Sequence, residues 1–107
     1  MTDARIVLTT TGNRDEAEKI ARSLVERELA ACVNILGPIT SIYRWKGKIE
    51  SGDEFLLLIK TTEDAFEQVK TAIRELHSYE MPEIVELSVA RGESKYLAWI
   101  EHSVHYE

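Results

Sequence analysis

The sequence predicts an α+β domain in which two β-α-β units are joined by a long β-hairpin and followed by a short C-terminal helix. Two observations lead to this prediction. Strand-like apolar runs alternate with two segments whose apolar residues recur at helical spacing. Between them, residues 39–62 have the pattern of two long strands joined at the turn-forming pair Lys46-Gly47. This order is that of the ferredoxin-like βαββαβ sandwich, built as a single domain over residues 1–107.

The first half of the chain predicts a strand, a helix and a second strand. Residues 5–10 are rich in β-branched and apolar side chains, which favours a buried strand. Asn13 predicts a helix N-cap, because Glu16 follows three residues later as in a capping box. Residues 32–36 return to strand character, and Gly-Pro at 37–38 predicts a bend or bulge. The buried stripe of the helix is predicted to consist of Ala17, Ile20, Ala21, Leu24 and Val25.

The second half repeats this order. A second helix is expected to begin at residues 61–62 and to end near His77, because Pro82 and the loop before it cannot extend it. The alternation of apolar and polar residues over 83–89 predicts a fourth strand. Ser94 is expected to cap a final helix whose apolar residues occupy more than one face. We therefore expect part of that helix to meet a neighbouring subunit.

The central hairpin is predicted to be an assembly device. Large or apolar side chains occupy both faces of its first arm, in the order Ser41, Ile42, Tyr43, Arg44, Trp45. A monomer of 107 residues offers little surface to cover so long a hairpin. Because bare strand edges pair readily with other chains, we expect the hairpin to contact further copies.

Composition limits the classes of function. The net charge of −6 and the sequence pI of about 5.1 disfavour binding to nucleic acid or to an anionic membrane. Cys32 is the only cysteine and is expected to be a buried, inert thiol. No apolar signal segment follows a basic start, and the longest apolar run, 55–59, is too short to span a bilayer. These features predict a cytoplasmic protein.

Five short segments together form a family signature. They are Ala-Ala-Cys-Val-Asn-Ile at 30–35, Ser-Ile-Tyr-Arg-Trp-Lys-Gly-Lys-Ile-Glu at 41–50, Leu-Ile-Lys-Thr at 58–61, His-Ser-Tyr-Glu-Met-Pro-Glu-Ile at 77–84 and Tyr-Leu-Ala-Trp-Ile at 96–100. In this order and spacing the chain resembles the CutA divalent-cation-tolerance proteins. The resemblance implies a ferredoxin-like subunit in a compact homotrimer, built like the PII signalling proteins. It also implies a role linked to divalent metals, especially copper.

One departure from the family pattern concerns metal ligands. Family members linked to copper carry a Cys at the end of the first strand and two adjacent His at the end of the second helix. This chain has Thr9, Leu76 and His77 at the matching positions. Since Cys32 lies in the second strand, it does not replace the missing Cys. The soft Cys-His-His site that suits copper is therefore not available from those positions.

His77, Glu80 and Glu83 are the candidate metal ligands. One imidazole and two carboxylates could hold a divalent ion such as zinc, manganese or copper(II). The alternative is that His77 favours the helix dipole while the two acids face water. His102 and His105, three residues apart, could pair on a helix or belong to a frayed tail.

Four aromatic residues and one lysine are the candidates for a small-ligand site: Tyr43, Trp45, Lys60, Tyr79 and Trp99. The aromatic rings could line a cleft that stacks a planar ligand, or could pack a trimer interface. Lys60 could neutralise an anion or pair with a glutamate of another subunit. No Gly-rich phosphate loop, nucleophile elbow or Cys-x-x-Cys metal loop is present in the sequence, so no enzyme class is indicated.

The predicted function is tolerance of, or response to, divalent metal ions by a non-enzymatic homotrimer that binds copper or zinc and neither nucleic acid nor membranes. Two alternatives stay open. One is a PII-like trimeric sensor that binds a small ligand between subunits. The other is a structural trimer with no ligand.

Overall fold

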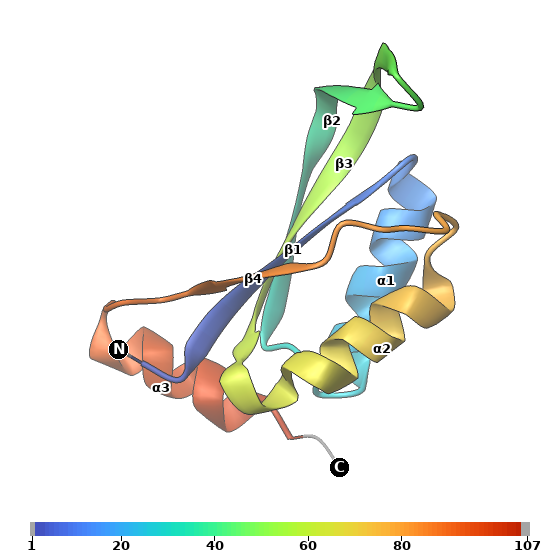
Figure 1. Cartoon of the computed structure of the whole chain (residues 1–107). Helices are drawn as coiled ribbons and strands as arrows, with labels where there is room; N and C mark the ends of the chain where they lie inside the picture. The colour runs from blue at the N-terminus through green and yellow to red at the C-terminus, as the bar shows by residue number, and fades with distance from the viewer. Residues whose placement is uncertain (1, 106–107) are drawn as a thin grey trace.

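The fold is a four-stranded antiparallel sheet that packs against helices (Figure 1). It is seen in a computed structural model, which describes residues 2–105. The strand order is β2-β3-β1-β4, and each pairing is antiparallel. The elements are β1 (Ala4–Thr11), α1 (Arg14–Glu26), β2 (Cys32–Trp45), β3 (Lys48–Thr62), α2 (Phe66–Leu76), β4 (Val85–Ser88) and α3 (Ser94–Ser103). This arrangement confirms the predicted α+β, ferredoxin-like fold with its long hairpin and C-terminal helix.

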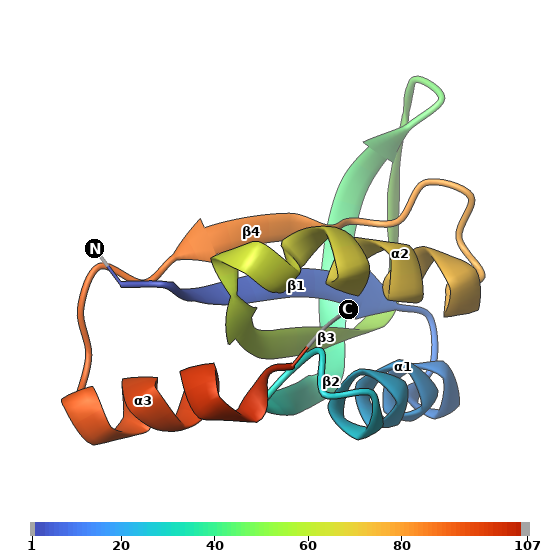
Figure 2. The same cartoon turned by 90° about the horizontal axis from the view of Figure 1, so that it is seen from below.

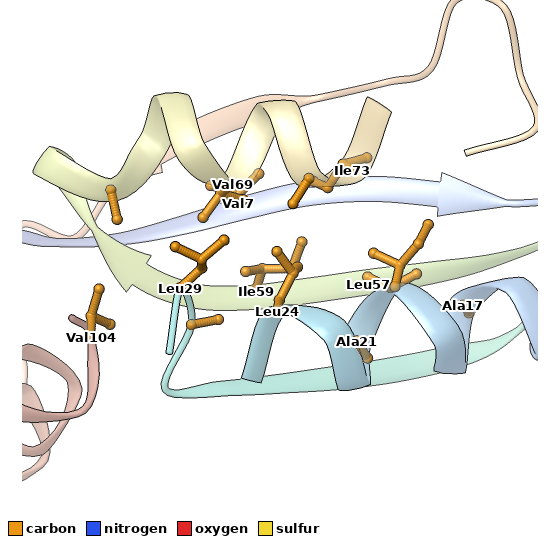
Figure 3. Close-up of a cluster of buried hydrophobic side chains, with 14 residues drawn as sticks. Val7, Ala17, Ala21, Leu24, Leu29, Leu57, Ile59, Val69, Ile73 and Val104 are labelled. Atoms are coloured by element: carbon orange, nitrogen blue, oxygen red, sulfur yellow. The ribbon is translucent and has the colours of Figure 1, made fainter. Parts of the chain in front are cut away.

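Helices α1 and α2 lie on the same face of the sheet and enclose the core with it (Figure 2). Val7 pairs with Ile59, and Leu57 lies two residues before Ile59 on the same side of β3. These three side chains are fully buried under the helices (Figure 3). The helices contribute equally buried partners, namely Ile20, Leu24, Val69 and Ile73. None of the described helices has the length and apolar character needed to cross a membrane.

Two predicted helix boundaries are confirmed. The side chain of Asn13 accepts a hydrogen bond from the Glu16 amide at 2.8 Å, which satisfies one of the free N–H groups at the start of α1. The predicted start of the second helix at residues 61–62 is wrong, because β3 continues to Thr62 and a short 3₁₀ turn, Glu63–Ala65, precedes α2, which begins at Phe66. His77 is the C-cap of α2, and its amide still donates to the carbonyl of Ile73 at 2.9 Å.

Two other boundaries differ from the prediction. Ser94 does not cap α3, because the carboxylate of Glu93 accepts hydrogen bonds from the amides of residues 95–96, at 2.8 and 3.1 Å. A carboxylate in this position also favours the positive end of the helix dipole. The fourth strand covers only Val85–Ser88 and not 83–89, since it pairs with just four residues of β1.

A bulge in β2 determines which way the hairpin faces. Leu36 pairs with Leu56, whereas Ile39 pairs with Glu54, so three steps along β2 match two along β3. Because side chains alternate along a strand, the extra residue places Ile39 on the same side of the sheet as Leu36. The predicted bulge at residues 37–38 is therefore confirmed.

Glycines shape the hairpin at both ends. Gly37 has a φ of +153°, and a Cβ there would lie 2.6 Å from a ring carbon of Phe55. No larger residue fits without a shift of its neighbours. At the tip, Lys46 and Gly47 have φ values of 50° and 79°, the pair of positive angles that a two-residue hairpin turn of type I′ requires. The predicted reversal at this pair is confirmed.

The face of the sheet that α1 and α2 leave uncovered is largely apolar. Its apolar side chains, which we call the open face, are Ile6, Leu8, Leu36, Leu56, Leu58, Val85 and Leu87. Leu36, Val85 and Leu87 are between 43% and 48% exposed in the isolated chain. Apolar surface of this extent is typical of an interface. Beyond the open face the hairpin projects away from the rest of the chain (Figure 1).

The buried side of α1 offers a first prediction. Leu24→Ala should lower the free energy of unfolding by about 2–5 kcal/mol, because it removes a fully buried side chain and leaves a cavity. Urea denaturation at fixed protein concentration measures the change. The sequence predicts that its neighbour Val25 belongs to the buried stripe of this helix. That prediction is wrong, because Val25 is 42% exposed. Val25→Ala, the matched control, should cost less than about 1 kcal/mol; equal losses would contradict this packing.

Candidate functional site

A groove of about 820 Å³ lies where the hairpin leaves the sheet. Leu8 of β1 and Leu56 of β3, both on the open face, form its floor. Tyr43 and Trp45 of β2 line it because the β2 bulge turns them to this side. The loop between α2 and β4 forms the remaining wall. Strand, hairpin and loop, which are far apart in sequence, therefore meet at this groove.

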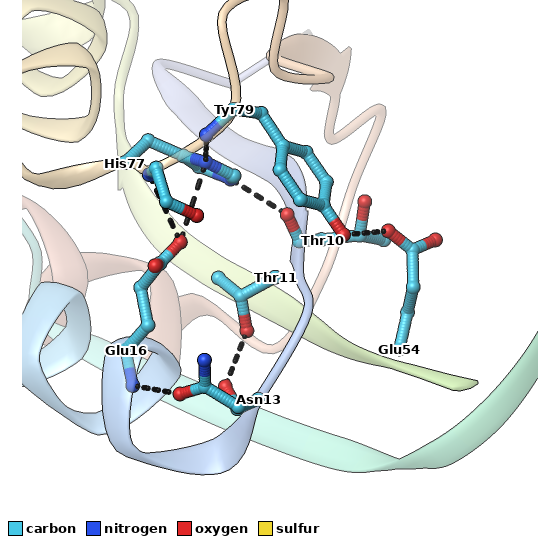
Figure 4. Close-up of polar contacts among 8 residues, drawn as sticks. Thr10, Thr11, Asn13, Glu16, Glu54, His77 and Tyr79 are labelled. Carbon is cyan, nitrogen blue, oxygen red and sulfur yellow. Dashed lines mark hydrogen bonds and ion pairs between the residues drawn. The ribbon is translucent and has the colours of Figure 1, made fainter. Parts of the chain in front are cut away.

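His77 anchors that loop to the end of β1 (Figure 4). Its side chain is fully buried. Its Nε2 lies 2.7 Å from the carbonyl oxygen of Thr10, which can only accept, so Nε2 carries the proton. Nδ1 in turn accepts a hydrogen bond from the Tyr79 amide at 3.1 Å. The imidazole thus joins β1 to the loop through both ring nitrogens.

Glu16 links the same loop to α1. Its Oε2 accepts a hydrogen bond from the Ser78 amide at 3.2 Å and lies 3.4 Å from Nδ1 of His77. The position of Glu16 is set by the helix start, since its own amide is held by Asn13. Contacts of Glu16 therefore hold the loop that follows α2 against the start of α1 (Figure 4).

Tyr79 closes one end of the groove. Its hydroxyl donates a hydrogen bond to Oε2 of Glu54 on β3 at 2.8 Å (Figure 4). Burial, followed by this hydrogen bond and by the negative charge of nearby Glu54, raises the pKa of Tyr79 to about 12. The ring also packs beside His77, with the two centroids 4.7 Å apart. Tyr79 is therefore a neutral donor at any ordinary pH.

The structure brings together three of the five residues predicted for a small-ligand site. Tyr43, Trp45 and Tyr79 line the groove. Lys60 lies elsewhere on β3, where its amino group donates to the side chain of Asn34. Trp99 lies on α3, where its ring packs against Tyr96 with centroids 5.6 Å apart.

Cys32 lies beside Lys60, with Sγ and Nζ 3.9 Å apart. The thiol is only half-buried, so the expectation of a buried cysteine is wrong for the isolated chain. The reason is its place in the strand pairing. Cys32 is paired with Lys60, on the side of the sheet away from α1 and α2.

The three predicted metal ligands are not gathered around one point. Glu80 and Glu83 line the groove, whereas the imidazole of His77 is turned into the protein and uses both nitrogens there. Within residues 2–105, no group of three or more His, Cys, Asp or Glu side chains could hold a metal ion. A complete single-chain metal site therefore does not fit this arrangement.

The two C-terminal histidines do not share a helix. α3 ends at Ser103, and His105 lies beyond it with its backbone amide bonded to the carbonyl of Glu28 at 2.8 Å. Its Nδ1 also lies 3.1 Å from Oε2 of Glu28. His105 therefore holds this part of the chain against the loop after α1, whereas His102 is an exposed residue of α3.

Sequence reasoning missed Glu54 and Arg44 as groove residues. Strand alternation gives a partial signal, since Glu54 lies two residues before Leu56 and so on the same side of β3. Nothing in the local sequence indicates that Glu54 meets Tyr79, because the two are 25 residues apart and joined only by the fold.

Comparison with known proteins identifies the family. The family model described as "CutA1 divalent ion tolerance protein" matches residues 5–103. The chain belongs to the CutA1 family. The Divalent-cation tolerance protein CutA of Thermus thermophilus is 47% identical over 98 residues, which cover 92% of this chain and 95% of that protein. The family description refers to tolerance of divalent ions and states no catalytic activity.

Some CutA1 relatives are longer than this chain. Protein CutA, chloroplastic, of Arabidopsis thaliana is 41% identical over 92% of this chain, and the match covers 54% of that protein. The chain thus spans about half the length of this plant relative. A solved structure of the divalent cation tolerance protein Cut A1 from Thermus thermophilus superposes with a TM-score of 0.93 at 45% identity, covering 95% of this chain and 99% of the other. The shared fold therefore extends over almost the whole CutA1 chain.

The raised pKa of Tyr79 leads to a pH prediction. Because the pKa is near 10 in the unfolded chain and about 12 in the folded one, the protonated phenol stabilises the fold fully below pH 10. The stabilisation should be lost as the pH rises from 10 to 12. The tyrosinate absorbance of wild type minus that of Tyr79→Phe isolates this titration from the other tyrosines. In Glu54→Gln the titration of Tyr79 should move toward lower pH, because the negative charge of Glu54 is removed. An unshifted titration would contradict the Tyr79–Glu54 bond.

His77 is expected to act as a structural anchor. His77→Ala should lower the free energy of unfolding by about 2–4 kcal/mol, because it removes two hydrogen bonds and a buried ring. The amide of Tyr79 should also exchange with solvent faster in this variant. His102→Ala, at an exposed position, is the matched control and should change stability by less than about 0.5 kcal/mol. Equal stability of the two variants would contradict the anchoring role.

Proposed function

We propose that this CutA1 protein acts as a homotrimer in tolerance of divalent cations, with the open face as the interface between copies. The observation that supports the proposal is the open face itself, an apolar surface next to a projecting hairpin. Ile42 and Ile49 on that hairpin are 72% and 69% exposed. A two-stranded hairpin is marginally stable alone, so contacts with other copies would stabilise it. The expectation that the assembly contains three copies comes from the resemblance to the CutA proteins.

Divalent cations would bind to this trimer through carboxylates. Glu80 and Glu83 are exposed at the groove, whereas both nitrogens of His77 are already bonded within the chain. Two carboxylates are too few for a complete site of zinc(II) or copper(II), so further donors would come from a second copy. The proposal therefore assigns cation binding to the assembly.

A second candidate function is that of a PII-like sensor which binds a small ligand between subunits. The groove favours this candidate, because about 820 Å³ lies within the range of small-molecule sites and far exceeds the size of a bare ion. Three aromatic side chains, Tyr43, Trp45 and Tyr79, line it and could stack a flat ligand.

Light scattering and zinc titration together test the proposal. The mass in dilute buffer should be three times the 12.2 kDa of one chain. Zinc(II) should bind saturably to the wild type, and the double variant Glu80→Gln with Glu83→Gln should bind at least tenfold more weakly, because it loses both carboxylates. Isothermal titration calorimetry measures the affinity.

Further variants test whether the loss of zinc binding is specific to Glu80 and Glu83. Glu26→Gln removes an exposed carboxylate at the end of α1, away from the groove, and should bind zinc like the wild type. His77→Ala should weaken zinc binding only indirectly, since the imidazole anchors the loop that carries Glu80 and Glu83. A tenfold loss in His77→Ala together with unchanged binding in the Glu80→Gln, Glu83→Gln double variant would instead assign His77 as a ligand. A mass of one chain would contradict the trimer, and a trimer without saturable zinc binding would favour the structural alternative.

A further inference from the structure

We infer that the groove takes an organic cation with a flat apolar body, of the arylalkylamine class. This inference rests on the small-ligand function proposed for the same groove and names the chemistry of the ligand. Three features of the groove support it: its charge, its aromatic lining and the oxygen of Glu54 that has no hydrogen-bond partner among the described residues.

The charges at the groove favour a cation. Glu54, Glu80 and Glu83 line it, and Arg44 is the single basic residue among the described lining residues. The groove therefore carries an excess of negative charge when its carboxylates are ionised. The whole chain also has a net charge of −6, which attracts cations and repels anions at long range. Anionic metabolites such as nucleotides would meet unfavourable charge here.

The aromatic lining favours a flat body over a simple ammonium or metal ion. Tyr43, Trp45 and Tyr79 surround an apolar floor that includes Leu8 and Leu56. A planar ring can stack on these side chains while its charged group stays near a carboxylate.

Trp45 itself already takes part in such a cation–π contact. The ammonium of Lys46 lies 5.8 Å from the ring centroid of Trp45. The indole of Trp45 is 48% exposed, so it remains accessible to a ligand.

Glu54 provides a directed acceptor for the charged group. Its Oε2 accepts the hydrogen bond from Tyr79, and its Oε1 has no hydrogen-bond partner among the described residues. Glu54 is half-buried, so an ammonium bonded to Oε1 would be partly shielded from water. Charge-assisted hydrogen bonds of this kind are roughly twice as strong as neutral ones. Tyr79 holds the carboxylate in place and therefore positions the acceptor.

The alternative that the test must exclude is that the hairpin tip of a second copy fills the groove. That tip carries two lysines, Lys46 and Lys48, which would also suit an acidic groove. The two occupants differ in what a change of Glu54 does. Loss of a ligand contact weakens ligand binding and leaves the assembly intact, whereas loss of a hairpin contact reduces the assembly.

Three indole compounds that differ in charge provide the test. Tryptamine is cationic, tryptophol is its uncharged counterpart, and indole-3-acetate is an anion. Calorimetric titration into the wild-type assembly should show saturable binding of tryptamine, at least tenfold tighter than that of the other two. Glu54→Gln should reduce tryptamine binding to the level of tryptophol, while Glu26→Gln should bind like the wild type. The charge series needs no variant and stays valid if Glu54→Gln fails to fold.

The mass of the assembly is measured on the same samples. Binding and mass together then distinguish a ligand in the groove from the hairpin tip of a second copy. Equal binding of all three indoles, or tightest binding of indole-3-acetate, would overturn the inference. An intact trimer without saturable tryptamine binding would also overturn it and would leave the proposed trimer standing. A smaller mass in Glu54→Gln without tryptamine binding would assign the groove to a second copy. A monomer that binds tryptamine selectively would support the ligand and contradict the trimer.

Discussion

The arrangement of the groove depends on one constraint, the bulge at residues 37–38 of β2. Without the extra residue, strand alternation would turn Tyr43 and Trp45 to the side of the sheet that carries α1 and α2. With it, they continue the open face and stand over Leu56. Gly37 is required there because a Cβ would collide with Phe55. One backbone feature therefore decides whether the hairpin contributes to the core side or to the groove.

The loop between α2 and β4 forms the wall of the groove that faces the hairpin. Its position depends on a second, polar set of contacts. Both ring nitrogens of His77 are used, one by the Thr10 carbonyl and one by the Tyr79 amide. Glu16 holds the intervening Ser78 amide. These bonds fix where the loop leaves α2, so that the Tyr79 hydroxyl reaches Glu54 across the sheet. His77, a candidate metal ligand by its sequence position, therefore uses both ring nitrogens within the chain.

Local patterns predicted what depends on neighbours in sequence. The Asn13 cap and the turn at residues 46–47 each follow from adjacent residue types, and the structure confirms both. The direction in which His77 points depends on Thr10, 67 residues away, and could not be derived from spacing. The burial of Cys32 depends on which side of the sheet faces the helices. Pattern alone does not distinguish the two faces, since apolar residues occupy both.

Assembly and ligand binding use adjoining parts of one surface. Leu8 and Leu56 belong both to the open face and to the floor of the groove. If copies of the chain meet on the open face, a ligand in the groove lies at the border of that contact. A ligand that binds only the assembled form stabilises it by an amount that grows with the logarithm of ligand concentration. Coupling between the two therefore needs no moving element, because shared residues are sufficient to link them.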